Sequence, residues 1–107
     1  MNIPASEVPQ NIKDVLDGNI IKGIALLDIH VPNWREKVNT NEIDMDSAKR
    51  CVIGQVYGSY AGGLDALALY HFNEYGFNYT TEINDANNIN DTVLMDYLTG
   101  AWKIALA

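Results

Sequence analysis

The spacing of apolar residues in the middle of the chain is the feature that most restricts its fold. Between residues 46 and 58, apolar side chains recur at intervals of three and four residues, which places them on one face of an α-helix. Asp46 or Ser47 can accept hydrogen bonds from the first amides of this helix. Gly58 and then Gly62-Gly63 are expected to end it and to permit a tight turn. The face predicted to point inward consists of Ala48, Cys51, Val52, Gln55 and Val56.

The same spacing predicts helices before this stretch. A short helix at 11–16 is expected to end at Gly18, and a second one, starting at Asn19, is expected to stop before Pro32. Gly23 lies inside that second helix, where a glycine lowers helix stability. Its presence indicates that another element packs closely at this point.

Further helices are expected in the rest of the chain. Residues 33–38 form a short predicted helix that carries Trp34 as a core anchor. A helix from Leu64 to Tyr75 would end at Gly76 in the left-handed conformation. Asp91 can begin a last helix. The side chains on its predicted buried face are Leu94, Tyr97, Leu98, Ala101, Trp102 and Ala105.

These segments predict an all-α fold, a compact bundle of four to five short helices in one domain spanning residues 1–107. Residues 1–10 contain two prolines and are expected to be an irregular lead-in. Alternating residues at 77–83 permit a short extended segment, although no convincing partner strand exists. The predicted core includes Ile24, Leu27, Trp34, Cys51, Val52, Val56, Leu64, Leu67, Leu98 and Trp102.

The formal net charge is −7, and it is distributed unevenly. Residues 1–50 carry eight acidic and six basic side chains, whereas no lysine or arginine lies between Arg50 and Lys103. That acidic half cannot neutralise phosphates, which argues against direct binding to nucleic acid. A basic protein surface would be attracted to it, although acidity can also serve solubility alone.

Aromatic residues accompany the carboxylates in this half and suggest a binding surface. Tyrosines among acidic side chains suit a partner that is basic and partly apolar. The same rings would also suit the second face of helices packed on both sides, so both interpretations stay open. The residues predicted to contact a partner are Asp65, Glu74, Tyr57, Tyr60, Tyr70, Tyr79, Glu82 and Asp85.

Motifs for catalysis, metals or cofactors are largely missing from the sequence. The glycines at 58–63 have neither the lysine nor the preceding strand of a phosphate-binding loop, and the Asn/Asp-rich tract at 84–91 lacks the glycine and glutamate of a calcium loop. We therefore expect no metal and no cofactor. An alternative is a ligand-binding or enzymatic pocket around Cys51, Gln55 and His71, although a buried cysteine is ordinarily inert.

The single cysteine cannot form a disulfide within the chain, which favours a reducing compartment. No charged and apolar leader opens the sequence, and no apolar run is long enough to span a membrane. The sequence thus predicts a soluble cytoplasmic protein that does not contact membranes.

Several segments are similar to one family of proteins. The chain resembles small uncharacterised proteins of bacteriophages and bacteria over residues 23–106, through GIALLDIHVPNW, EIDMDSAKRCVIGQVYG, GLDAL, YGF and YLTGAW. Members of that family often have a second cysteine where this chain has Ala48, and a glycine where it has Asn33. The resemblance implies a phage-associated setting in the cytoplasm of a bacterial host, and it implies no particular chemistry.

The leading functional prediction is a non-catalytic binding protein that engages a basic surface of a host protein. Small acidic phage proteins often work by covering such surfaces, so an inhibitor or counter-defence role of the anti-CRISPR type is expected. Two alternatives remain, the pocket described above and a structural subunit that forms a homodimer.

Overall fold

Helices form all of the regular structure in the part of the chain that the computed structural model describes, which is residues 8–67, 75–78 and 89–107. The prediction of an all-α fold is therefore confirmed. Phe77 and Asn78, the described part of the segment expected to be extended, lie in a turn, and 79–83 lie outside the described residues. The elements are α1 (Gln10–His30), α2 (Trp34–Lys37), the 3-10 helix η2 (Thr40–Glu42), α3 (Val52–Tyr57), α4 (Tyr60–Leu67) and α6 (Asp91–Ala105).

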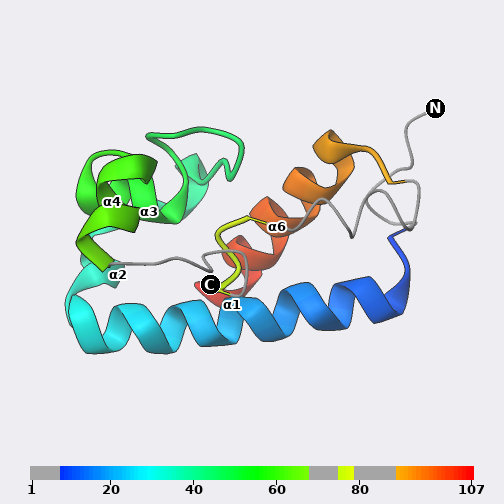
Figure 1. Cartoon of the computed structure of the whole chain (residues 1–107), viewed down its shortest axis with the longest axis horizontal. Helices are drawn as coiled ribbons and strands as arrows, with labels where there is room; N and C mark the ends of the chain where they lie inside the picture. The colour runs from blue at the N-terminus through cyan, green and yellow to red at the C-terminus, as the bar shows by residue number, and fades with distance from the viewer. Residues whose placement is uncertain (1–7, 68–74, 79–88) are drawn as a thin grey trace.

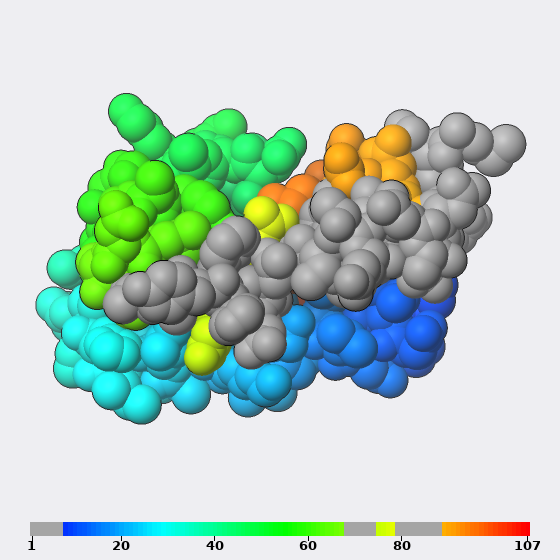
Figure 2. Space-filling model, in the orientation of Figure 1, coloured from blue at the N-terminus to red at the C-terminus, as the bar shows by residue number. Residues whose placement is uncertain are grey.

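The longest helix, α1, runs along one border of the molecule, with the other helices on one side of it in this view (Figure 1). α6 packs on α1, α3 packs on α4, and α2 packs on α3. The short helices gather near the C-terminal end of α1 (Figure 1). The space-filling view shows α1 as a continuous lower border of the molecule (Figure 2). α1 therefore acts as the base on which the other elements are arranged.

The break expected at Gly18 is absent, because α1 is one helix of 21 residues. A glycine within a helix costs only about 1 kcal/mol relative to alanine, which burial of neighbouring turns can offset. The helix ends where expected, before Pro32. Its inward face consists of Ile12, Leu16, Ile20, Gly23 and Leu27, which continues across Gly18 at intervals of three and four residues.

Gly23 lies where another segment approaches α1 closely, as the sequence predicted. A Cβ atom at this position would collide with the backbone carbonyl of Tyr75 and would lie 3.3 Å from Cζ of Phe77. Gly76, in the same turn, has a φ of 76° and sits against the backbone of Ile20. The turn at 75–78 is thus held on α1 by two glycines, one from each partner.

The centre of the core is a group of three aromatic rings. Trp102 stacks on Phe77 with ring centroids 5.8 Å apart, and Trp34 meets Trp102 edge to face at 6.4 Å. The Trp102 indole Nε1 donates a 2.8 Å hydrogen bond to the carbonyl of Gly76, which satisfies both buried groups. α6, α2 and the 75–78 turn therefore meet at one point.

Most of the predicted core residues are buried, with two exceptions among those named above. Ile24 and Leu64 are only half-buried. On α6, the predicted inward position Ala105 is exposed and is the last residue of the helix. The cap of α6 is Asn90 rather than Asp91, and its side chain accepts a hydrogen bond from the Thr92 amide.

The middle helix begins later than expected, at Val52. Residues before it form turns, in which Asp44 Oδ1 accepts from the Asp46 amide and Ser47 Oγ accepts from the Arg50 amide. Asp46 and Ser47, the residues predicted to cap the helix, therefore take part in these turns instead. α3 ends as predicted at Gly58, which has a φ of 93°.

Gly62 and Gly63 do not form the expected turn, because both lie inside α4. A Cβ atom at Gly63 would collide with the side chain of Ile53 and lie 3.0 Å from Cδ2 of Tyr57. The glycine therefore lets α4 approach α3 closely, and its role is in packing.

Candidate functional site

The predicted partner surface is described at three of its eight residues. Asp65 is exposed on α4, whereas Tyr57 and Tyr60 are half-buried. The other predicted contacts lie outside the described residues; they are Glu74, Tyr70, Tyr79, Glu82 and Asp85. The structure thus leaves this surface as a prediction.

The two described tyrosines contribute to packing around α3 and α4. The Tyr57 ring lies against Gly63, and burial raises the pKa of its hydroxyl. Burial also raises the pKa of Tyr60, which helps to line a hollow of about 220 Å³ between α6 and the 45–48 segment. Both rings therefore contribute to packing between elements, as the second interpretation of the tyrosines expected.

Cys51 and Gln55, two members of the alternative pocket, have structural contacts. Cys51 is 1% exposed, its Sγ accepts a 3.2 Å hydrogen bond from the Gly54 amide, and burial raises the pKa of its thiol. The Gln55 Oε1 accepts from the Asn39 amide at 2.7 Å, and its Nε2 donates to the Arg50 carbonyl at 2.9 Å. Gln55 therefore ties two loops to α3. His71 lies outside the described residues.

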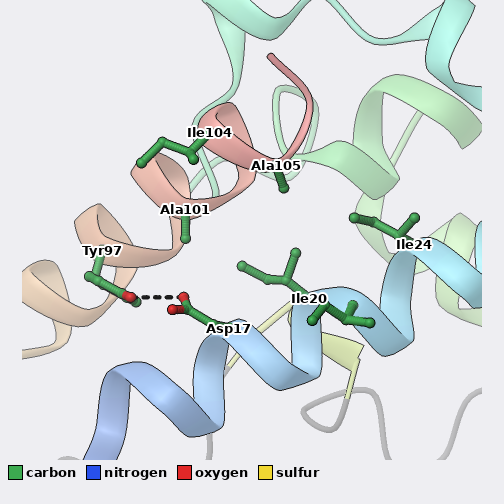
Figure 3. A pocket seen from close by; sticks show the side chains of 8 residues that line it. Asp17, Ile20, Ile24, Tyr97, Ala101, Ile104 and Ala105 are labelled. Atoms are coloured by element: carbon green, nitrogen blue, oxygen red, sulfur yellow. Dashed lines mark hydrogen bonds between the residues drawn. The ribbon is translucent and has the colours of Figure 1, made fainter. Parts of the chain in front are cut away.

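A second hollow of the described surface is a groove between α1 and α6. It has a volume of about 270 Å³, and side chains of α1 and α6 face each other across it (Figure 3). Its lining is mostly aliphatic and consists of Asp17, Ile20, Ile21, Ile24, Tyr97, Ala101, Ile104 and Ala105. We call this feature the α1–α6 groove.

The α1–α6 groove has one polar end. There the Tyr97 hydroxyl donates a 2.8 Å hydrogen bond to Asp17 Oδ1 (Figure 3). Burial, followed by this hydrogen bond and the negative charge of Asp17, raises the pKa of Tyr97, and Asp14 adds to the effect. The ammonium of Lys13 lies 5.9 Å from the centre of the Tyr97 ring. A carboxylate therefore stands at the end of an apolar channel.

Exposure of large apolar side chains distinguishes this groove from ordinary helix packing. Ile104 is 79% exposed and Ile21 is 69% exposed, although both border the groove. The buried face predicted for the last helix did not include Ile104. Ile104 follows Trp102 by two positions, which turns it away from the buried face of α6. That offset is the only signal in the sequence that could have indicated it.

Two kinds of feature are absent from the residues that the structure describes. No group of three histidine, cysteine, aspartate or glutamate side chains is arranged to hold a metal ion in residues 8–67, 75–78 and 89–107. In the same residues, no helix has both the length and the apolar character needed to cross a membrane.

Comparisons with known proteins gave no relative. No protein-family model matches the chain, and neither a curated protein nor a solved structure matches it. The resemblance to small phage proteins therefore remains a prediction from the sequence.

Proposed function

We propose that this protein is a small acidic binding protein without catalytic activity, and that it engages a basic segment of another protein in the α1–α6 groove. One observation carries the proposal. An open aliphatic channel, bordered by the 79% exposed Ile104, ends at the carboxylate of Asp17.

The geometry suits a partner that offers apolar and cationic groups in sequence. An amphipathic helix can place an aliphatic side chain between Ile24 and Ala101, with a lysine or arginine two turns away at Asp17. Asp17 is exposed, and Asp14 lies one turn earlier on α1. A guanidinium or ammonium group would gain charge-assisted hydrogen bonds there.

The net charge supports the same class of partner. A formal charge of −7 attracts a basic protein from a distance and raises the rate of encounter at low ionic strength. Because such attraction is screened by salt, binding should weaken as salt rises. The apolar contact in the groove would retain part of the affinity.

The proposed setting follows from the resemblance to phage proteins. In a bacterial host, covering a basic surface of a host protein would inhibit that protein, and a nuclease of a defence system has a surface of this kind. An inhibitor of the counter-defence type is therefore the biological role we propose. The predicted surface around Asp65 is a second location for the same activity.

Affinity capture from a bacterial lysate tests the proposal when variants are compared. Ile104→Ser and Asp17→Asn should each reduce retention of a basic protein that the unchanged chain holds at low salt. The matched controls are Ile29→Ser, an equally exposed isoleucine outside the groove lining, and Asp46→Asn, an exposed aspartate in a loop.

The outcomes separate the two surfaces. Loss of the captured protein with the groove variants, and not with the controls, would support binding in the groove. If the captured protein were lost only with the variant Asp65→Lys, binding would instead be assigned to the surface predicted from the sequence. Equal retention by all variants would contradict both locations.

A further inference from the structure

The side of α1 that faces away from the core is itself partly apolar. A helix at the border of a protein normally presents polar residues to solvent. The outward side of α1, which we call the outer face, instead mixes apolar, small and charged residues at helical spacing. It consists of Asn11, Asp14, Val15, Gly18, Ile21, Lys22, Ala25 and Ile29.

Large aliphatic side chains concentrate on the outer face. Val15 is 49% exposed, Ile21 69% and Ile29 76%. Together with Ile104, these are the large hydrophobic side chains found exposed among the described residues. Single exposed aliphatic residues need no explanation. Val15 and Ile21, however, flank Gly18 on the same face within two turns of helix, whereas Ile29 lies further along it.

Gly18, at the centre of the outer face, has no packing contact within the described chain that would require a glycine. A Cβ atom added there would meet nothing within 4 Å, whereas one at Gly23 would collide with another segment. Helix stability alone would favour alanine at such a position. A glycine does permit close approach of a second backbone from outside.

The charges of the outer face are arranged symmetrically about this glycine. Asp14 lies four residues before Gly18 and Lys22 lies four residues after it. Within one helix the two are about 12 Å apart along the axis, because each residue rises 1.5 Å. Neither ion pair found among the described residues includes Lys22.

We propose that two copies of this chain form an antiparallel dimer through the outer face, with the two-fold axis passing at Gly18. In that register Asp14 lies opposite Lys22 of the second copy, and the reciprocal pair forms by symmetry. Val15 lies opposite Ile21 of the second copy. Gly18 meets Gly18, which brings the two helices close together.

The charge pattern selects this register over the parallel one. A parallel pair in register would place Asp14 beside Asp14 and Lys22 beside Lys22, and like charges at such distances repel. The antiparallel pair makes two attractive contacts and also opposes the two helix dipoles. A contact through one helix per chain buries a small area, so the dimer should be weak and should dissociate on dilution.

The dimer and the proposed binding function are tested separately. Ile104 and Asp17 are not part of the outer face, whereas Ile21 and Asp14 lie beside both surfaces. Ile21 is therefore excluded from the variants used to test either one, and Asp14 is changed only where self-association is measured.

Sedimentation equilibrium over a wide range of protein concentrations tests the proposal. The unchanged chain should show a reversible monomer–dimer equilibrium. Lys22→Glu places a second carboxylate opposite Asp14 and should raise the dimer dissociation constant about tenfold or more, since two attractive pairs become repulsive. Lys49→Glu, the same charge change at an exposed residue outside α1, should leave the constant nearly unchanged.

Charge exchange gives the sharper result. The double variant Asp14→Lys with Lys22→Glu restores both pairs in the antiparallel register and should recover most of the lost affinity. Gly18→Leu should raise the helix stability of the monomer and weaken the dimer, because it fills the space at the two-fold axis. Circular dichroism checks that each variant stays folded.

Three results would overturn the dimer: a monomer at all concentrations, a dimer insensitive to Lys22→Glu, or a double variant no better than the single one. Recovery of the dimer affinity in the double variant, after its loss in Lys22→Glu, would support the stated register.

Discussion

The indole Nε1 of Trp34 donates a 2.8 Å hydrogen bond to Asp28 Oδ1, across the turn that ends α1. Arg35 donates to the same oxygen at 2.8 Å, and its guanidinium carbon lies 4.7 Å from the centre of the Trp34 ring. Trp34 is fully buried. The segment LLDIHVPNW thus encodes one structural unit, in which a carboxylate fixes the tryptophan that anchors α2.

We predict that Asp28→Ala lowers the stability of the protein. The buried Trp34 side chain would lose the acceptor of its indole, and an unsatisfied donor at a core residue is costly. Urea unfolding followed by tryptophan fluorescence measures the effect. Asp46→Ala, which removes an exposed aspartate in a loop, is the matched control and should shift the midpoint much less. Equal shifts would show that the hydrogen bond is unimportant.

The Asp28 carboxylate should also make the stability of the protein depend on pH. The hydrogen bond from Trp34, and then Arg35, holds the pKa of Asp28 below its ordinary value of 3.8. Because the pKa is lower in the folded state, this contribution is complete above pH 3.8 and is lost as the pH falls toward the folded value. Asp28→Asn lacks it, so its stability deficit should shrink below that pH. A deficit that stays constant in acid would contradict the assignment.

A third prediction concerns the close approach of the 75–78 turn to α1. Gly23→Ala should destabilise the protein by about 1–3 kcal/mol, because the added methyl group collides with the Tyr75 carbonyl. Gly100→Ala is the matched control, since a Cβ atom there meets nothing within 4 Å. That change should raise stability by about 0.5–1 kcal/mol through helix propensity. Urea unfolding of both variants gives the comparison, and two changes of the same sign would be inconsistent with the packing.

Local spacing allowed much of the fold to be predicted. Burial was predicted correctly for Trp34, Leu98 and Trp102. Each lies on the apolar face of a helix whose position can be read from the sequence alone. Gly23 was recognised as a contact because its cost within a helix required a reason. The prediction that a helix ends at Gly18 was wrong, although it also relied on the cost of a glycine within a helix. Burial of Leu16 and Ile20 on either side keeps α1 continuous, and that burial depends on partners elsewhere in the chain.

The candidate site could not be predicted in the same way. The α1–α6 groove joins Asp17 to Tyr97, which are 80 residues apart, and a single sequence contains no signal that pairs them. The start of α3 was also missed, because Cys51 is a rare cap and Ser47 is a common one. The groove depends on contacts between elements, and periodicity describes only one element at a time.

The last prediction separates a structural role of Cys51 from a reactive one. A pocket that used this thiol would need it accessible and ionised, but it is 1% exposed and burial raises its pKa. Ellman's reagent should therefore react slowly with the folded protein, at the rate at which the structure opens, and at once in concentrated urea. Cys51→Ala should cost about 1–2 kcal/mol, through the lost hydrogen bond to the Gly54 amide and the small cavity. Rapid labelling of the folded chain would refute this account and favour the pocket with Gln55 and His71.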